Sequence, residues 1–152
     1  MSKLGSNISA NNTAKATAVR LLSRRDHSVL ELKRKLELRE FPRDEIDDVL
    51  EDLIKRDYLS DERFCESYIH IRKQKGFGPL RIGVELNERG VDETVYHDYL
   101  QSYSDAWIDV LERIYQTKYR GKPIKDFQEK AKRIRFLQYR GFTLDNIHKV
   151  LK

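Results

Sequence analysis

A fifteen-residue pattern occurs three times in this chain of 152 residues, and its copies lie 50 and then 51 residues apart. The copies begin at Leu36, Leu86 and Leu137, and each has an arginine three residues after that leucine and apolar residues at the same later offsets. A period of this length is typical of repeat proteins, whose units are too small to bury an apolar face alone and complete their core against a neighbour. The pattern therefore predicts a row of similar modules with function on an extended surface.

The composition favours helical modules. Charged residues make up 36% of the chain and apolar residues 39%, which suits amphipathic helices with solvated outer faces. Only seven glycines and three prolines are present, which argues against an all-β fold. The single cysteine, Cys65, cannot form an internal disulfide and is expected to be a small buried residue. No stretch resembles a secretory signal or a membrane span, so we expect a cytoplasmic protein with no membrane partner.

Capping and breaking residues predict nine helices in three sets of three. Ser28 and Glu31 have the spacing of a capping box, Pro79 suits a first helical turn, and Gly90 suits a helix end. The first five predicted helices cover about 13–24, 28–39, 43–55, 60–75 and 79–90. The sixth and seventh start near residues 92 and 104, the eighth covers about 125–140, and the ninth starts after Thr143. The predicted fold is all-α, with three tandem three-helix repeats forming an elongated, curved helical body.

The same pattern predicts the limits of the modules and the buried faces of two helices. A Ser- and Asn-rich disordered tail is expected over 1–12, followed by repeats over 13–58, 59–103 and 104–152. The first helix should bury a stripe with Ala16, Val19 and Leu22. The eighth helix should bury a stripe with Phe127, Ala131, Ile134 and Leu137.

Positive charge gathers in the third module. Residues 14–58 contain 11 basic residues (Lys and Arg) and 11 acidic residues (Asp and Glu), and residues 59–103 contain 6 basic and 8 acidic residues. Residues 104–152 contain 12 basic and 6 acidic residues. Third-module cations alternate with tyrosines in two runs, 118–122 and 130–140. This mixture suits single-stranded nucleic acid, where phosphates meet cations and bases stack on rings, although tyrosines at helical spacing also pack inside helical proteins.

The segment 72–81 has two open interpretations. Its cations flank a glycine-interrupted turn that opens a helix, so free backbone amides and side chains could hold a phosphate or a carboxylate. Alternatively, it is an ordinary interhelix turn with solvated lysines. The segment lacks the Lys-Ser or Lys-Thr pair of a P-loop, so nucleotide hydrolysis is not implied.

Other polar residues favour structural roles. Arg39, Arg89 and Arg140 each close a predicted helix, where a cation interacts favourably with the helix dipole. The acidic helix 43–55 is expected to be a solvated face rather than a cation site. The four histidines have no zinc-ligand spacing, and no serine or cysteine has a convincing base, so we expect no metal, cofactor or catalytic activity.

Three runs of sequence resemble the RecX regulatory proteins. They are RDHSVLELKRKL at 25–36, DYLSDERF at 57–64 and KGFGPLRIGVEL at 75–86, and with the third repeat the resemblance covers residue 14 to the end. The family is built of tandem three-helix repeats, in agreement with the period. Glu40 and Asp57 stand where relatives commonly have turn glycines; a positive φ there would suit Asp57 better than Glu40.

The resemblance implies a non-enzymatic regulator of the RecA recombinase, and we expect this chain to be monomeric. Such proteins bind the RecA nucleoprotein filament, restrain its ATPase, strand-exchange and coprotease activities, and bind single- and double-stranded DNA. One alternative is a general DNA-binding helical protein without a RecA-specific role, and another is a helical scaffold for an unrelated protein. The predicted partner- or DNA-binding residues are Arg25, Lys33, Arg34, Arg72, Lys73, Lys75, Arg81, Lys118, Arg120, Lys122, Lys130, Lys132, Arg133, Arg135 and Arg140.

Overall fold

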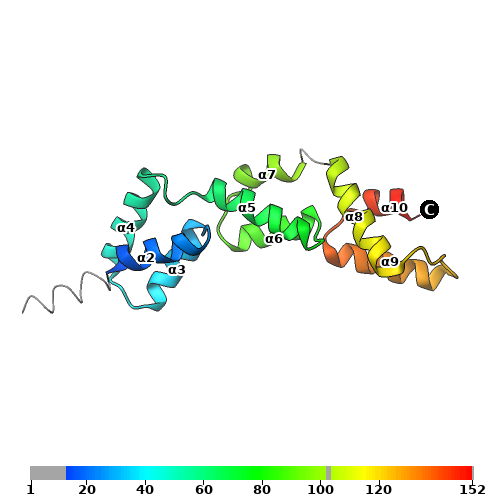
Figure 1. Cartoon of the computed structure of the whole chain (residues 1–152), viewed down its shortest axis with the longest axis horizontal. Coiled ribbons are helices and arrows are strands. Elements are labelled where there is room, and N and C mark those ends of the chain that lie inside the picture. Colours follow the sequence, from blue (N-terminus) through cyan, green and yellow to red (C-terminus); the bar gives the residue numbers. More distant parts are fainter. Residues whose placement is uncertain (1–12, 102–103, 152) are drawn as a thin grey trace, which may run out of the picture. The chain divides into compact units, whose positions relative to one another are not determined.

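The described part of the chain consists of helices joined by turns and short connections. The computed structural model describes residues 13–101 and 104–151, and within them it contains nine helices and no strand (Figure 1). The helices are α2 (Ala14–Arg24), α3 (Val29–Leu38), α4 (Arg43–Lys55), α5 (Asp61–Gln74), α6 (Pro79–Glu88), α7 (Glu93–Gln101), α8 (Ser104–Tyr119), α9 (Phe127–Arg140) and α10 (Leu144–Val150). The predicted all-α class is confirmed, while the predicted tail lies outside the described residues. Of the helices described, none has the length and apolar character needed to cross a membrane.

Side-chain caps fix several helix starts where the sequence predicts them. The Ser28 hydroxyl accepts from the Glu31 amide at 3.0 Å, and the Ser28 amide donates to the Glu31 carboxylate at 3.2 Å, which completes the capping box. Thr143 accepts from the amide of Asn146 at 3.2 Å and starts α10. Each cap satisfies amides that the first helical turn leaves without a partner.

The recurring apolar positions form the cores of the modules. Leu36, Leu86 and Leu137, the first residues of the three copies, are each 0% exposed. The other repeated positions are also buried or half-buried: Phe41, Ile46, Val49 and Leu50; Val91, Tyr96, Tyr99 and Leu100; Phe142, Ile147, Val150 and Leu151. The period therefore marks burial, as the repeat interpretation requires.

Two predicted buried stripes are wrong in part. In α2, the buried residues include Ala14, Ala18 and Leu21, whereas Val19 is 48% exposed. The small Ala14 and Ala18 side chains let α2 approach its neighbours closely, so the buried face is turned from the predicted one. Phe127 begins α9 and is 84% exposed, so it does not join the buried stripe that ends at Leu137.

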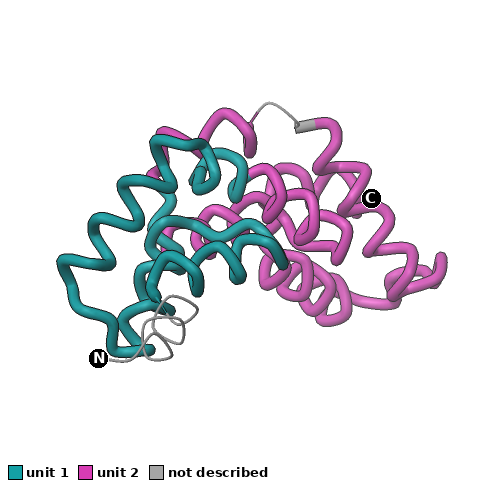
Figure 2. Tube along the Cα trace, turned by 60° about the vertical axis from the view of Figure 1, so that its left-hand side comes forward, with its two compact units in different colours: residues 1–65, 89–91 teal, residues 66–88, 92–152 magenta. Residues whose placement is uncertain are grey.

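The chain forms two compact units. Unit 1 contains residues 1–65 and 89–91, and unit 2 contains residues 66–88 and 92–152 (Figure 2). In unit 1, α2, α3 and α4 pack against one another in pairs. Their buried core includes Leu32, Leu36, Ile46, Leu53 and Leu59.

Within unit 1, the turn before α3 contacts the segment 89–91. The Ser28 hydroxyl donates to the carbonyl oxygen of Arg89 at 2.7 Å. Gly90 has φ +79°, and a Cβ there would lie 2.6 Å from the Cβ of Leu30. Only glycine fits this close approach, so the segment 89–91 can lie directly against the first turn of α3.

Unit 2 contains a matching contact between its second-repeat and third-repeat helices. The amide of Gly78 donates to the carbonyl oxygen of Arg140 at 2.8 Å, and the amide of Leu80 donates to that of Gly141 at 3.0 Å. Gly141 has φ +103°, and a Cβ there would lie 2.4 Å from the Cβ of Arg81. We call this contact and the unit 1 contact the repeat joints, because both place the first interhelix turn of one repeat against the second interhelix turn of the next.

The two residues that depart from the family's turn glycines both have a left-handed backbone. Glu40 has φ 63° and Asp57 has φ 61°. Glu40 occupies the same repeat position as Gly90 and Gly141. Aspartate tolerates this region better than glutamate because its short side chain can hydrogen-bond locally, so the strain falls mainly on Glu40.

Candidate functional site

In unit 2, cations and aromatic rings alternate across helices of the second and third repeats. Three elements and one turn supply them: α6, α8, α9 and the turn between α5 and α6. Each cation lies over at least one ring, in the geometry of a cation–π contact. We call this set the cation–aromatic row: Lys118, Phe136, Arg140, Phe77, Arg81 and Tyr139.

The row begins on α8 and α9. Lys118 Nζ lies 3.9 Å from the centre of the Phe136 ring. The guanidinium carbon of Arg140 lies 5.5 Å from the same centre and 4.7 Å from that of Phe77. Arg140 thereby joins α9 to the turn that precedes α6.

The row continues onto α6. The guanidinium carbon of Arg81 lies 4.7 Å from the centre of the Phe77 ring and 4.8 Å from that of the Tyr139 ring. Arg81 also donates to the carbonyl oxygen of Tyr139 at 3.2 Å. Tyr139 is 73% exposed, so this end of the row presents an aromatic surface beside a positive charge.

Glu85 holds two arginines beside Phe77. Arg72 donates to both carboxylate oxygens at 2.8 Å, and Arg81 donates at 3.3 Å. Burial alone would raise the pKa of Glu85, but hydrogen bonds from Arg72 and Tyr68 hold that pKa below its usual value. The ionised Glu85 balances one charge, so the row and Arg72 keep an excess of positive charge.

Guanidinium groups also cap the end of α5. Arg113 donates to the carbonyl oxygens of Lys73 and Gln74 at 2.9 and 3.2 Å. Arg140 donates to the carbonyl oxygen of Lys75 at 3.1 Å. Cations at a helix C-terminus satisfy its last carbonyls and complement its dipole. Arg140 thus has a structural role, although the helix that it caps is α5 rather than its own.

The turn between α5 and α6 does not offer free amides to a phosphate. The amides of Gly76 and Phe77 donate to carbonyls of α5, and those of Gly78 and Leu80 donate across the repeat joint. Of the two open interpretations of the segment 72–81, the structure favours the interhelix turn for the backbone. The backbone turn does not account for the density of cations in this segment. Phe77 accounts for part of it, because the guanidinium carbon of Arg72 lies 3.8 Å from the centre of the Phe77 ring.

Arg133 does not belong among the predicted contact residues. It is 2% exposed, and its guanidinium donates to Tyr115 at 2.7 Å, to Glu129 at 2.6 Å and to the carbonyl oxygen of Lys122 at 3.0 Å. The guanidinium carbon also lies 4.3 Å from the centre of the Tyr119 ring. A buried cation with these partners holds α8, α9 and their connection together and cannot meet a partner.

The structure separates the remaining predicted cations into two groups. Arg25, Lys33 and Arg34 belong to unit 1, and Arg25 forms an ion pair with Glu31 at 3.2 Å. The others belong to unit 2, where Arg72, Arg81, Lys118 and Arg140 gather at the row. The remaining unit 2 cations are exposed or half-buried: Lys73, Lys75, Arg120, Lys122, Lys130, Lys132 and Arg135. The sequence prediction did not include Phe77, Phe136 and Arg113 among the site residues, because no regular spacing in the sequence relates these three positions.

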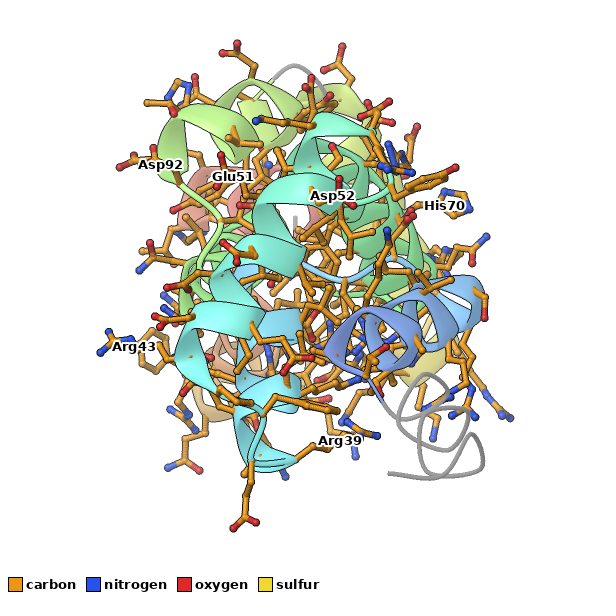
Figure 3. The ribbon with its side chains drawn as sticks, turned by 90° about the vertical axis from the view of Figure 1, so that its left-hand side faces the viewer. Arg39, Arg43, Glu51, Asp52, His70 and Asp92 are labelled. Atoms are coloured by element: carbon orange, nitrogen blue, oxygen red, sulfur yellow. The ribbon has the colours of Figure 1, made fainter. Side chains whose placement is uncertain are left out.

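Unit 1 presents a different surface. Figure 3 shows Arg39 after α3 and Arg43 at the start of α4, where the Arg43 side chain points away from the ribbon. Arg39 donates to the carbonyl oxygen of Lys35 in its own helix at 3.4 Å, as the dipole interpretation expects. On α4, Asp52 pairs with Arg56 at 3.1 Å. Among residues 13–101 and 104–151, no group of three or more histidine, cysteine, aspartate or glutamate side chains could hold a metal ion.

These features define a class: a helical repeat protein that presents a cation-rich, aromatic surface. Models of the first, second and third three-helix domains of RecX match residues 14–53, 60–100 and 106–151. The chain belongs to the RecX family of regulatory proteins.

Curated relatives and solved structures agree with this assignment. The chain is 39% identical to Regulatory protein RecX of Pseudomonas savastanoi pv. phaseolicola over 135 residues, which cover 89% of this chain and 87% of that protein. It is 37% identical to the Legionella pneumophila protein of the same name, over 90% of this chain and 91% of the relative. The crystal structure of RecX from Lactobacillus salivarius has a TM-score of 0.75 at 23% identity and covers 90% of this chain and 91% of its own, which supports the fold.

Proposed function

We propose that this protein is a negative regulator of RecA. It binds the RecA–DNA filament and inhibits the ATPase, strand-exchange and coprotease activities, so that it modulates recombination and DNA repair. It acts in the cytoplasm as a monomer without catalysing a reaction, and it contacts single- and double-stranded DNA as well as RecA. Membership of a family of regulatory proteins supports this proposal.

The observation that carries the proposal is the cation–aromatic row. Four cations are held over aromatic rings: Arg81, Lys118 and Arg140 of the row, and Arg72 beside it. Glu85 is the acidic partner that Arg72 and Arg81 share. A ring supports a cation without neutralising its charge, so the excess charge stays available to phosphates or acidic side chains. Because the positions are fixed before binding, less side-chain entropy is lost on contact.

Exposed cations of α9 extend this surface. Lys132 and Arg135 are exposed on the helix that contributes Phe136 and Arg140 to the row. Arg133, between them in sequence, is excluded because it is buried. A surface that combines the row with Lys132 and Arg135 could span neighbouring protomers of a filament and hinder either its conformational cycle or its growth.

The test is the DNA-dependent ATPase of RecA, measured while this protein is titrated onto preformed filaments at fixed salt. We expect inhibition, and we expect the double variant Lys132→Glu and Arg135→Glu to require about tenfold more protein for the same effect, as for lost charge contacts. Arg43→Glu is the matched control, because Arg43 is an exposed cation at the start of α4. Equal inhibition by the folded double variant and the wild type would remove these two residues from the surface.

One observation favours a second candidate, a general DNA-binding protein. Tyr139 is 73% exposed beside Arg81, and such a pair can stack on an unpaired base and contact its phosphate. A gel-shift titration without RecA distinguishes the two candidates. Strong DNA binding with a steep salt dependence, together with no effect on the RecA ATPase, would favour the second candidate.

A further inference from the structure

Unit 2 also has an apolar groove that the proposed function does not use. Its volume is about 930 Å³, and residues of α6, α7 and α10 line it, with α8 at one side. The apolar part of the lining includes Leu80, Gly83, Val84, Tyr96, Leu100 and Trp107. The volume is in the range of pockets that bind ligands rather than of packing defects.

The groove exists because α7 packs against the middle of one face of α6. A Cβ at Gly83 would lie 3.3 Å from Leu100 and 3.5 Å from Tyr96, so the missing side chain lets α7 approach closely. Leu80 and Val84 lie one helical turn apart beside this contact and remain 57% and 59% exposed. Two large apolar side chains on one stripe of a helix, both facing a groove, form a surface suited to another apolar surface.

Trp107 gives the groove a fixed wall. Its side chain is 1% exposed, and its indole N–H donates to the carbonyl oxygen of Leu100 at 2.8 Å. This bond orients the ring against the end of α7. The groove is therefore shaped by the fold before any partner arrives.

The charged residues of the groove are mainly acidic. Glu88, Glu93 and Asp145 line it, whereas Lys149 is the lysine in the lining and His97 the histidine. This balance is opposite to the net charge of +5 of the chain and to the cation–aromatic row. An apolar groove with acidic margins matches an apolar segment that carries basic residues at its sides.

We propose that this groove receives an amphipathic helix of a partner protein, with leucine-like residues on one face and lysine or arginine along its margins. A helix is the matching element because the walls of the groove are helices and the spacing of Leu80 and Val84 can interlock with side chains three or four residues apart. The inference uses a different surface from the cation–aromatic row and does not depend on the proposed role toward RecA.

The first test uses Trp107, which is the single tryptophan of the chain, as an internal probe. A synthetic helical peptide of about 14 leucine and lysine residues in an amphipathic order is titrated onto the full chain, and tryptophan fluorescence is recorded. We expect a saturable change, and we expect binding at least about tenfold weaker for a scrambled peptide and for an acidic version. The absence of saturable change, or an equal response to the scrambled or acidic peptide, overturns the proposal.

The second test uses exposed positions, so that the variants keep the core intact. Val84→Lys and Glu93→Lys should each weaken peptide binding about tenfold, because one places a charge in the apolar lining and the other reverses a margin charge. The controls are Val19→Lys and Asp47→Lys, which change similarly exposed residues of unit 1. Circular dichroism checks folding, and equal binding by all four variants overturns the proposal.

Sedimentation of the chain alone tests whether a second copy of the chain occupies the groove instead. Dimers that form with concentration and are abolished by Val84→Lys would make a second copy the occupant and overturn the proposal; a monomer across the concentration range supports it. These assays contain neither DNA nor RecA. Their failure is thus distinguishable from failure of the proposed regulatory role.

Discussion

His27 lies in the turn between α2 and α3 and is 2% exposed, beside cationic side chains. Its Nδ1 is 3.0 Å from the carbonyl oxygen of Arg25 and must donate to it, so Nε2 is left to accept from Lys35 at 2.8 Å. Burial lowers the pKa of His27, and the nearby charges of Arg25 and Lys35 lower it further, against the opposing effects of the Arg25 carbonyl and Glu31. The fold therefore requires neutral His27.

This requirement predicts an acid-sensitive free energy of unfolding. Because the pKa of His27 is lower in the folded chain than its ordinary 6.5, its contribution is fully present above pH 6.5 and is lost as the pH falls below that value. We expect the loss to approach at most about 1.4 kcal/mol per pH unit. Comparison with His27→Gln, whose polar side chain does not titrate in this range, isolates the effect in urea titrations between pH 7 and 5. Parallel pH profiles for the two proteins would contradict the assignment.

Glu40 carries backbone strain that a single substitution can remove. With φ at 63°, Glu40→Gly should raise the free energy of unfolding by about 1 kcal/mol. The control is Glu37→Gly, the same change inside α3, which should lower it by about 0.5–1 kcal/mol because glycine weakens a helix. Urea titration of both variants gives the signs, and destabilisation by Glu40→Gly would show that its left-handed conformation carries no strain.

At the scale of elements, the repeat joints depend on the absence of a Cβ. In unit 2, the turn after α9 lies against the start of α6 so closely that a Cβ added at Gly141 would lie 2.7 Å from the amide nitrogen of Arg81. The hydrogen bonds from Gly78 and Leu80 across this joint hold two helix ends together without a side chain. Any atom added at Gly141 must push the two ends apart.

Gly141→Ala should therefore lower the free energy of unfolding by about 3 kcal/mol, because of strain at positive φ together with overpacking. Gly121→Ala is the matched control, because Gly121 also has a positive φ of 75° but has nothing within 4 Å of an added Cβ. In the control, the free energy of unfolding should fall by only about 1 kcal/mol. Thermal or urea unfolding measures both, and equal losses would mean that the joint tolerates a Cβ.

Local signals predicted most of the elements, whereas contacts between elements could not be predicted. The capping box of Ser28 and the helix start at Pro79 depend on residues close in sequence, and both are confirmed. The cation–aromatic row joins side chains from α6, α8, α9 and a turn, and no spacing in the sequence connects Phe77 with Phe136. For the same reason, the burial of Arg133 among partners from α8 and α9 could not be seen in a run of surface-like cations.

At the scale of the whole molecule, the net charge of +5 predicts salt-dependent binding to DNA. Each lost phosphate contact should reduce the slope of log affinity against log salt by about 0.7 for single-stranded DNA. We expect Lys132→Gln and Arg135→Gln each to reduce the slope by this amount and Arg43→Gln to leave it unchanged. Fluorescence anisotropy at several salt concentrations measures the slopes, and an unchanged slope would show that neither α9 cation contacts a phosphate.

The repeat joints also determine where the series of repeats can be extended. Gly90 and Gly141 accept the helix start of the preceding repeat because each has only a hydrogen where other residues have a side chain. In the first repeat, Glu40 holds that position and carries a Cβ where Gly90 and Gly141 have only a hydrogen. A further repeat added before the first one, or a second molecule stacked there by the same contacts, would collide with Glu40. The residue at this repeat position thus decides whether the turn can accept a neighbouring helix start.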